Sequence, residues 1–416
     1  MGMTIGEKIL ADAAHKDKVV PGEIVTVDLD LIMSNDGTTH ITIDMFENDI
    51  KKKEIFDEKK IVFIVDHNIP AENEKTAMVH KKMREFADEH NIDFHEGRGV
   101  CHQVMVEDYV TSGQLILGAD SHTCTYGALG AFGTGVGCTD FLYAMVTGTT
   151  WLMVPETIKI NLKGKLPKGV YPRDLMLKII GDIGANGANY KILEFGGDGI
   201  KNFNISDRLV LCNLAVEAGA KTGIIEADEI TLEYLKSKGR NPKKVFCSDE
   251  DAQYSKIYEY DLTNLKPVIA RPDHIDDVVL IQDVQNVKID EAFIGSCNSG
   301  RIEDLRAAAE ILKGKKINEQ VRCIITPASN NVYLQALEEG LLNIFIESGA
   351  MIMNPNCSVC WGSCQGVIGE GEVLISTGTR NFKGRAGHKD SKVYLASVSS
   401  VAASAVAGFI TKYEDD

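Results

Sequence analysis

The sequence predicts an α/β protein built on parallel sheets, and three observations indicate this class. Short, continuous apolar runs alternate with helical patterns along most of the 416 residues, which is typical of strand–helix–strand units. The runs lack the polar alternation of a half-exposed strand, as expected where both faces of a parallel sheet are covered. Polar, glycine-rich turns follow these runs directly. In open α/β sheets that carboxyl edge is where ligands bind.

Each predicted element has its own local signal. Apolar runs that lead into polar turns predict buried strands at 61–65, 115–119, 292–294, 321–325 and 350–353. Apolar residues at positions 302, 305, 308, 309 and 312 predict a helix over 302–312, and a similar pattern predicts another over 332–342. Between these regions we expect a strand at 157–162, helices at 172–183 and 206–219, and a polar surface excursion at 237–251.

The chain is long for a single hydrophobic core, so several domains are expected. Val154-Pro155 and Lys266-Pro267 interrupt the pattern of elements. We therefore predict three α/β domains, covering residues 1–153, 154–267 and 268–416. The third would hold the cysteines described below.

Composition argues against several classes of protein. A formal net charge of −16 disfavours nucleic acid as the main partner. No apolar run approaches the roughly 18 residues of a membrane span, and the first residues lack the pattern of a signal peptide. Ten cysteines are scattered along the chain without the dense spacing of a secreted disulfide scaffold. We expect a cytoplasmic protein that binds neither nucleic acid nor membrane.

Three cysteines are the most informative residues. Cys297 lies alone in a Gly-Ser-Cys loop, and Cys357 and Cys360 form a Cys-x-x-Cys pair about sixty residues later. Three thiolates at strand ends can hold three corners of an iron–sulfur cube and leave one iron open as a Lewis acid. The alternatives are half of a zinc site, a redox dithiol, or a small buried residue at Cys297. Zinc would need further soft ligands, and only Cys364 lies near.

Histidines beside aspartates are candidates for proton transfer. Asp66 and His67 are adjacent, Asp120 and His122 are two apart, and His102 follows a cysteine. An aspartate can fix the tautomer of a histidine and raise its basicity. The alternative for each is a structural histidine at the end of a strand.

Two further pairs and one glycine-dense run complete the candidates. Asn213 and Glu217 are four apart and would share one helix face; taken alone they would face solvent. Arg380 and Arg385 could form a fork for carboxylates, or be surface arginines in a turn. The run 127–137 contains no G-x-G-x-x-G, so close backbone packing near a cofactor is the better interpretation.

Four motifs occur together and in order: Gly118-Ala-Asp-Ser-His-Thr-Cys124, Gly295-Ser-Cys297, Cys357-x-x-Cys360 and Arg380-Asn-Phe-x-Gly-Arg385. On these motifs the chain resembles the aconitase superfamily over essentially its whole length. Within it, the chain is most similar to the large subunits of 3-isopropylmalate dehydratase and homoaconitase. The resemblance implies a three-domain aconitase-like core that lacks the C-terminal swivelling domain of single-chain aconitases.

The resemblance also implies roles for individual residues. Cys297, Cys357 and Cys360 would hold a 4Fe–4S cluster, and His67, paired with Asp66, would protonate the departing hydroxyl. The remaining residues would surround the substrate: His102, Asp120, His122 and Glu217 near the iron-bound water, Ser121 and Asn213 as orienting groups, and Arg380 and Arg385 at the carboxylates. Dehydrating a hydroxy acid needs this combination of acid, base and metal.

The implied function is that of a hydro-lyase acting on a 2- or 3-hydroxy dicarboxylic acid. The first candidate is 3-isopropylmalate dehydratase of leucine biosynthesis; homoaconitase and 2,3-dimethylmalate dehydratase are alternatives. A small subunit carrying the swivelling domain would supply a serine base and more arginines, in a heterodimer or heterotetramer. An iron-responsive RNA-binding protein and a structural zinc protein are alternatives from other classes. The charge disfavours the first of these.

The chain departs from the family pattern around the cysteines. Asn298 and Ser299 stand where Thr-Asn is usual, Asn356 where a small residue is usual, and Thr379 where asparagine is usual. Cys364 is an additional thiol. These changes remove no expected ligand, but they leave the substrate open.

Overall fold

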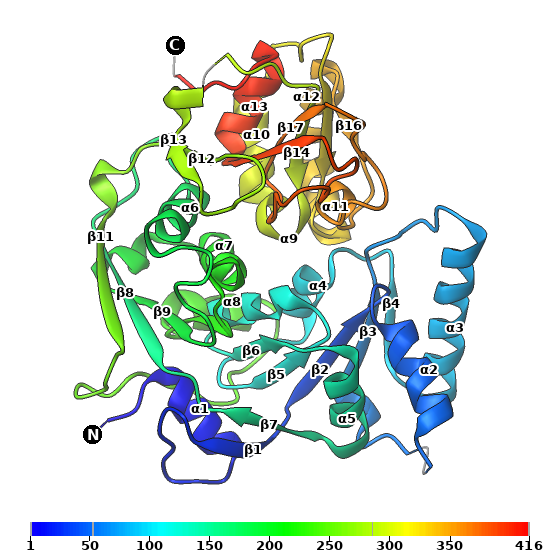
Figure 1. Cartoon of the computed structure of the whole chain (residues 1–416), viewed down its shortest axis with the longest axis vertical. Helices are drawn as coiled ribbons and strands as arrows, with labels where there is room; N and C mark the ends of the chain where they lie inside the picture. The colour runs from blue at the N-terminus through cyan, green and yellow to red at the C-terminus, as the bar shows by residue number, and fades with distance from the viewer. Residues whose placement is uncertain (1, 52–53, 285, 415–416) are drawn as a thin grey trace.

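The computed structural model describes residues 2–51, 54–284 and 286–414, and its fold is mixed α/β (Figure 1). The predicted class is confirmed. In these residues one sheet has the order β4-β3-β2-β5-β6 and a second the order β10-β9-β8-β11, and both are parallel throughout. A third sheet, β13-β12-β18-β17-β14-β15-β16, is parallel except at β12.

The strands of each sheet come from consecutive parts of the chain. The first sheet contains β2 (Leu31–Asn35), β3 (Ile61–Val65), β4 (Asp93–Glu96), β5 (Leu115–Gly118) and β6 (Phe132–Gly135), and β1 (Ile24–Asp28) pairs with β7 (Thr149–Met153) in an antiparallel ribbon. The second contains β8 (Thr157–Lys163), β9 (Ile192–Gly196), β10 (Thr222–Ile225) and β11 (Lys256–Asp261). The third contains β12 (Val268–Ala270), β13 (Val278–Leu280), β14 (Glu291–Gly295), β15 (Arg322–Thr326), β16 (Met351–Ile352), β17 (Val373–Ser376) and β18 (Lys392–Ala396). The predicted domain boundaries stay a prediction.

Helices pack against each of these sheets. The first sheet is accompanied by α1 (Ile5–Ala13), α2 (Thr39–Asp49), α3 (Glu74–His90), α4 (Cys101–Asp108) and α5 (Cys138–Thr147), and the second by α6 (Pro172–Ile183), α7 (Ile205–Asn213) and α8 (Glu229–Ser237). The third is accompanied by α9 (Ser296–Ser299), α10 (Ile302–Leu312), α11 (Asn330–Glu338), α12 (Leu341–Ser348) and α13 (Val398–Ala407). In the described part of the chain, no helix has the length and apolar character needed to cross a membrane.

Most predicted elements are present, and two helices differ from prediction. The helix expected over 332–342 is two helices, because Gly340 adopts a left-handed conformation with φ +74° and ends the first. The helix expected over 206–219 is α-helical only to Asn213 and continues as the 3-10 helix Leu214–Ala218. Asn213 and Glu217 therefore do not share one face of an α-helix.

The glycine-dense run serves close backbone packing, as predicted. A Cβ on Gly127 would lie 1.7 Å from the carbonyl oxygen of Gly223 in β10. In β6, a Cβ on Gly135 would lie 2.6 Å from the carbonyl oxygen of Asp120. Because these glycines lack a side chain, the segment that follows β5 can lie directly on its neighbours.

The carboxyl ends of the first and third sheets face each other. Asp66 and His67 follow β3, and Asp120 follows β5. In the third sheet, Cys297 lies just after β14, while Cys357 and Cys360 follow β16. In Figure 1 the short helix α9 of the upper lobe faces α4 of the lobe below. Residues far apart in the sequence thus meet between the lobes.

Candidate active site

A cavity of about 210 Å³ lies where the two sheet edges meet. Ten of the predicted site residues line it: His67, His102, Asp120, Ser121, His122, Cys297, Cys357, Cys360, Arg380 and Arg385. The other three, Asp66, Asn213 and Glu217, lie behind these and bond to them. The structure therefore places every predicted site residue in one region of the molecule.

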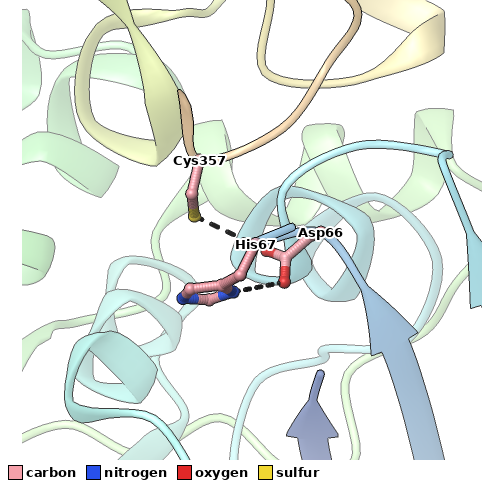
Figure 2. Close-up of side chains that lie close together, drawn as sticks. All are labelled: Asp66, His67 and Cys357. Carbon is pink, nitrogen blue, oxygen red and sulfur yellow. Dashed lines mark hydrogen bonds and ion pairs between the residues drawn. The ribbon is translucent and has the colours of Figure 1, made fainter. Parts of the chain in front are cut away.

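Asp66 and His67 form a buried pair (Figure 2). Asp66 Oδ1 lies 2.7 Å from His67 Nδ1, while its Oδ2 accepts the N–H of Cys101 at 2.6 Å. Burial alone lowers the pKa of His67, but the carboxylates of Asp66, Asp36 and Asp120 outweigh it and raise that pKa to about 10. His67 is therefore an imidazolium at neutral pH and can donate a proton.

Asp36 is a site residue that the sequence analysis missed. It follows β2, which was not predicted, and its carboxylate accepts the backbone N–H groups of Asp66, His67 and Asn68 at 2.9, 2.9 and 2.8 Å. Its Oδ1 also lies 3.8 Å from His67 Nδ1. Asp36 thus fixes the turn that carries His67. The available signal was an apolar run into Asn35-Asp36-Gly37, the same strand-to-turn pattern used elsewhere.

A line of acidic and basic side chains in contact with one another crosses the cavity wall. Asp120 Oδ1 lies 2.8 Å from His102 Nε2 and accepts the N–H of His122 at 2.8 Å. His122 Nε2 lies 2.9 Å from Glu217 Oε1. Although burial opposes the charged forms, these partners hold the pKa of Asp120 well below its usual range, lower that of Glu217 and raise that of His122.

Arg380 closes this line on the side of the third sheet. Its Nε donates to Glu217 Oε1 at 2.8 Å, and its Nη2 donates to Ser121 Oγ at 2.9 Å. Asn213 is fully buried, and Glu217 is engaged with both His122 and Arg380. The solvent-facing positions considered for Asn213 and Glu217 are therefore wrong.

Arg385 and Trp361 form another wall of the cavity. The guanidinium of Arg385 lies 5.7 Å from the centroid of the Trp361 ring, and Trp361 packs edge-on against His67 at 4.6 Å between centroids. Among the described residues, Arg385 Nε has no hydrogen-bond partner. Trp361 was not predicted as a site residue, because an aromatic residue next to a Cys-x-x-Cys carries no chemical signal of its own.

The three thiols fit an iron–sulfur cluster. All ten cysteines are free, and Cys297, Cys357 and Cys360 line the same cavity wall. Polar groups contact each sulfur: Asn213 Nδ2 donates to Cys297 Sγ at 3.3 Å, Thr379 Oγ1 lies 3.5 Å from Cys360 Sγ, and Asp66 Oδ2 lies 3.8 Å from Cys357 Sγ. Burial opposes ionisation of Cys360, but Arg385 and Thr379 lower the pKa of this thiol to about 7.

The geometry favours a cluster over a single zinc ion. A zinc ion about 2.3 Å from each sulfur would need sulfurs about 3.8 Å apart. The described groups compact enough for one ion are Asp66–His67–Cys357 and His102–Asp120–His122, and neither unites the three thiols. Cys364 is not among the residues that line the cavity. Its Sγ instead donates to the carbonyl oxygen of His67 at 2.9 Å.

Comparison with known proteins gives consistent relatives. A family model described as "Aconitase family (aconitate hydratase)" matches residues 7–408. The 3-isopropylmalate dehydratase large subunit of Hydrogenobaculum sp. is 49% identical, covering 100% of this chain and 98% of the relative. Large subunit 1 of that enzyme from Pyrococcus abyssi is 50% identical, covering 100% and 99%.

Two further relatives widen the comparison. A probable methanogen homoaconitase large subunit of Methanothermobacter thermautotrophicus is 45% identical, covering 98% of this chain and 97% of the relative. The crystal structure of Thermococcus kodakaraensis aconitase X in its holo-form matches with a TM-score of 0.53 at 12% identity, covering 92% and 91% of the two chains. At that identity the last match supports the fold alone.

Proposed function

The chain belongs to the aconitase family, and on that premise we propose that it is the large, cluster-bearing subunit of a cytoplasmic hydro-lyase. Its substrate would be 3-isopropylmalate, interconverted with 2-isopropylmalate in leucine biosynthesis. The supporting observation is the cavity itself, in which three free thiols, a protonated histidine and two arginines face one another. The names of the relatives that are 49% and 50% identical support this substrate.

Cys297, Cys357 and Cys360 would hold a 4Fe–4S cluster. When bound, the cluster supplies a Lewis acid that weakens the carbon–oxygen bond of the hydroxy acid. The thiols come from two loops of one sheet, which fixes their spacing through the strands β14 and β16. Cys364 is occupied with the His67 carbonyl and would take no part.

His67 would act as the general acid. Its ring is charged at neutral pH because three carboxylates stabilise the imidazolium, and Asp66 holds Nδ1 so that Nε2 points toward the cavity. A proton donated from Nε2 would convert the leaving hydroxyl to water. Asp120, whose Oδ2 lies 3.8 Å from Nε2, would help to orient that water together with His102 and His122.

Arginines would bind the substrate carboxylates. Arg385 has an unpartnered Nε among the described residues, which leaves this group free to pair with an anion. Arg380 already bonds Glu217 and Ser121, so it would hold a carboxylate mainly through its remaining donors. Two arginines and one acid do not complete the reaction, and we assign the base that removes the carbon-bound proton to a small subunit. The printed name "large subunit" of the relatives supports such a partner.

Homoaconitase is the second candidate, favoured by the relative that is 45% identical. None of the proteins named above supports RNA binding or the 2,3-dimethylmalate reaction. The test is to reconstitute the chain with iron and sulfide without oxygen and to add a small subunit of either specificity. We expect a brown protein that turns over 2-isopropylmalate orders of magnitude faster with the isopropylmalate-type subunit. Full turnover by the isolated chain would refute the two-subunit proposal, and turnover of a homoaconitase substrate alone would favour the second candidate.

A further inference from the structure

Arg173 is a fully buried cation that the proposed mechanism does not use. It stands in the first turn of α6, on the second sheet's side of the molecule, and is 2% exposed. Its Nη1 donates to Asn298 Oδ1 and, at 2.7 Å, to the carbonyl oxygen of Thr377, while its Nη2 donates to the carbonyl oxygen of Gly378. One guanidinium thus bridges two loops of the third sheet.

Each bridged loop leads to the candidate site within two residues. Asn298 follows Cys297 directly, and Gly378 precedes Thr379 and Arg380. Thr379 Oγ1 lies 3.5 Å from Cys360 Sγ, and Arg380 lines the cavity. Arg173 therefore sets the spacing between the loop that carries one thiol and the loop that contacts another.

Asn298 connects Arg173 to the sulfur of Cys297 through hydrogen bonds. The two ends of its amide face different partners, because Oδ1 accepts from Arg173 while Nδ2 donates to Asn213 Oδ1 at 2.9 Å. Asn213 Nδ2 in turn donates to Cys297 Sγ at 3.3 Å. A continuous hydrogen-bonded chain therefore runs from the guanidinium to the sulfur. It also gives a physical use to Asn298, one of the departures from the family pattern.

We propose that Arg173 and Asn298 are a positioning pair that orients Cys297 Sγ and the Thr379–Arg380 segment for cluster binding. The proposal rests on the proposed function, since it assumes a cluster on these thiols. Hydrogen bonds to ligating sulfur and nearby charge tune both the retention and the reduction potential of such clusters. Removing the guanidinium fork should therefore loosen the cluster, and removing its charge should make the potential more negative.

The test uses the reconstituted holoprotein with Arg173→Lys, which keeps a charge but loses the fork, and Asn298→Ala, which breaks the chain without burying a new group. We expect iron release to an anaerobic chelator to accelerate about 10- to 100-fold in each, as is typical when outer partners of metal ligands are lost. The double variant should release iron no faster than the more severe single variant, because both substitutions interrupt the same series of hydrogen bonds. In Arg173→Met, which removes the charge, we expect a more negative midpoint potential.

Arg208→Lys is the matched control. Arg208 is also fully buried and near the second sheet, but it pairs with Asp228 away from the cavity. A merely structural role for Arg173 predicts that both lysine variants melt earlier and release iron alike. An iron-release rate within twofold of wild type in Arg173→Lys and Asn298→Ala, an unchanged midpoint potential in Arg173→Met, or strictly additive effects would overturn the proposal. If Arg173→Lys does not fold, Asn298→Ala decides. Wild-type protein that binds no iron would instead overturn the proposed function.

Discussion

The substitution Asp36→Asn tests whether the carboxylate of Asp36 positions His67, the proposed general acid. In the wild type, one oxygen accepts from Asp66 and His67 and the other from Asn68. An asparagine that keeps the first oxygen turns its NH₂ group toward the Asn68 N–H, which leaves a part-buried donor unpaired at about 1–3 kcal/mol. The two remaining bonds lose their charge assistance, about 1 kcal/mol each. We expect a loss of about 3–5 kcal/mol, the range seen when a buried charged partner is removed.

This loss should appear locally. Hydrogen exchange of the peptide that contains residues 66–68, followed by mass spectrometry, should accelerate about 10²- to 10³-fold, since each 1.4 kcal/mol is about a factor of ten. Loss of the carboxylate 3.8 Å from His67 Nδ1 also lowers the pKa of His67. With a small subunit present, kcat should fall about 10- to 100-fold, part of what a positioned general acid contributes.

Asp44→Asn is the control for this experiment. Asp44 is exposed and pairs with Lys82 at the surface, so its substitution should change neither exchange nor kcat. The reasoning fails if Asp36→Asn leaves exchange of residues 66–68 and kcat within twofold of wild type. A large change in exchange with an unchanged kcat would assign Asp36 to folding alone.

Three further predictions follow from the same structure. Serine at any one of the three cavity cysteines should abolish bound iron and visible absorbance, whereas Cys364→Ser should retain both. Loss of the cluster in Cys364→Ser alone, with a full cluster in the other three variants, would reassign the ligands. Gly127→Ala should destabilise the chain by about 3 kcal/mol or more, because its Cβ would meet the carbonyl oxygen of Gly223 at 1.7 Å, whereas Gly137→Ala, with nothing within 4 Å, should leave the melting temperature nearly unchanged. Burial raises the pKa of Glu291 from 4.5 to about 7, so between these pH values the folded chain keeps a proton that the unfolded chain has lost, and stability falls as pH rises. In unfolding measured as a function of pH, Glu291→Gln should remove up to about 3 kcal/mol of this fall, and an unchanged dependence on pH would contradict the assignment.

Local apolar patterns in the sequence correctly predicted individual helices and strands. The apolar spacing at 302–312 gave α10 with both ends correct, and the run 61–65 gave β3. The same logic failed where a helix changes type without changing its apolar spacing, as after Asn213. It also failed at Gly340, whose positive φ separates two helices with a continuous apolar pattern.

The sequence predicted those site residues whose side-chain type already indicates their chemistry. Thiols and histidines at strand ends stand out in one sequence, and the structure brings them to one cavity. Asp36 had only the strand-to-turn pattern as a signal, and its role depends on backbone N–H groups about thirty residues away. Arg173 has no signal of this kind, because its partners lie in backbone groups about two hundred residues away. Aspartates and arginines are common on surfaces, and only the fold distinguishes these buried ones.

The separation in sequence between the two halves of the cavity constrains how the site is made in the cell. Asp66 and Cys357, whose side chains meet in the finished protein, are 291 residues apart. At a translation rate of roughly 5–20 residues per second, the first waits about 15–60 s for the second. During that interval the nascent chain exposes carboxylates and a histidine that the later segments will bury. Metal delivered then would meet the Asp and His residues without the thiols, so productive loading belongs after the last sheet has folded.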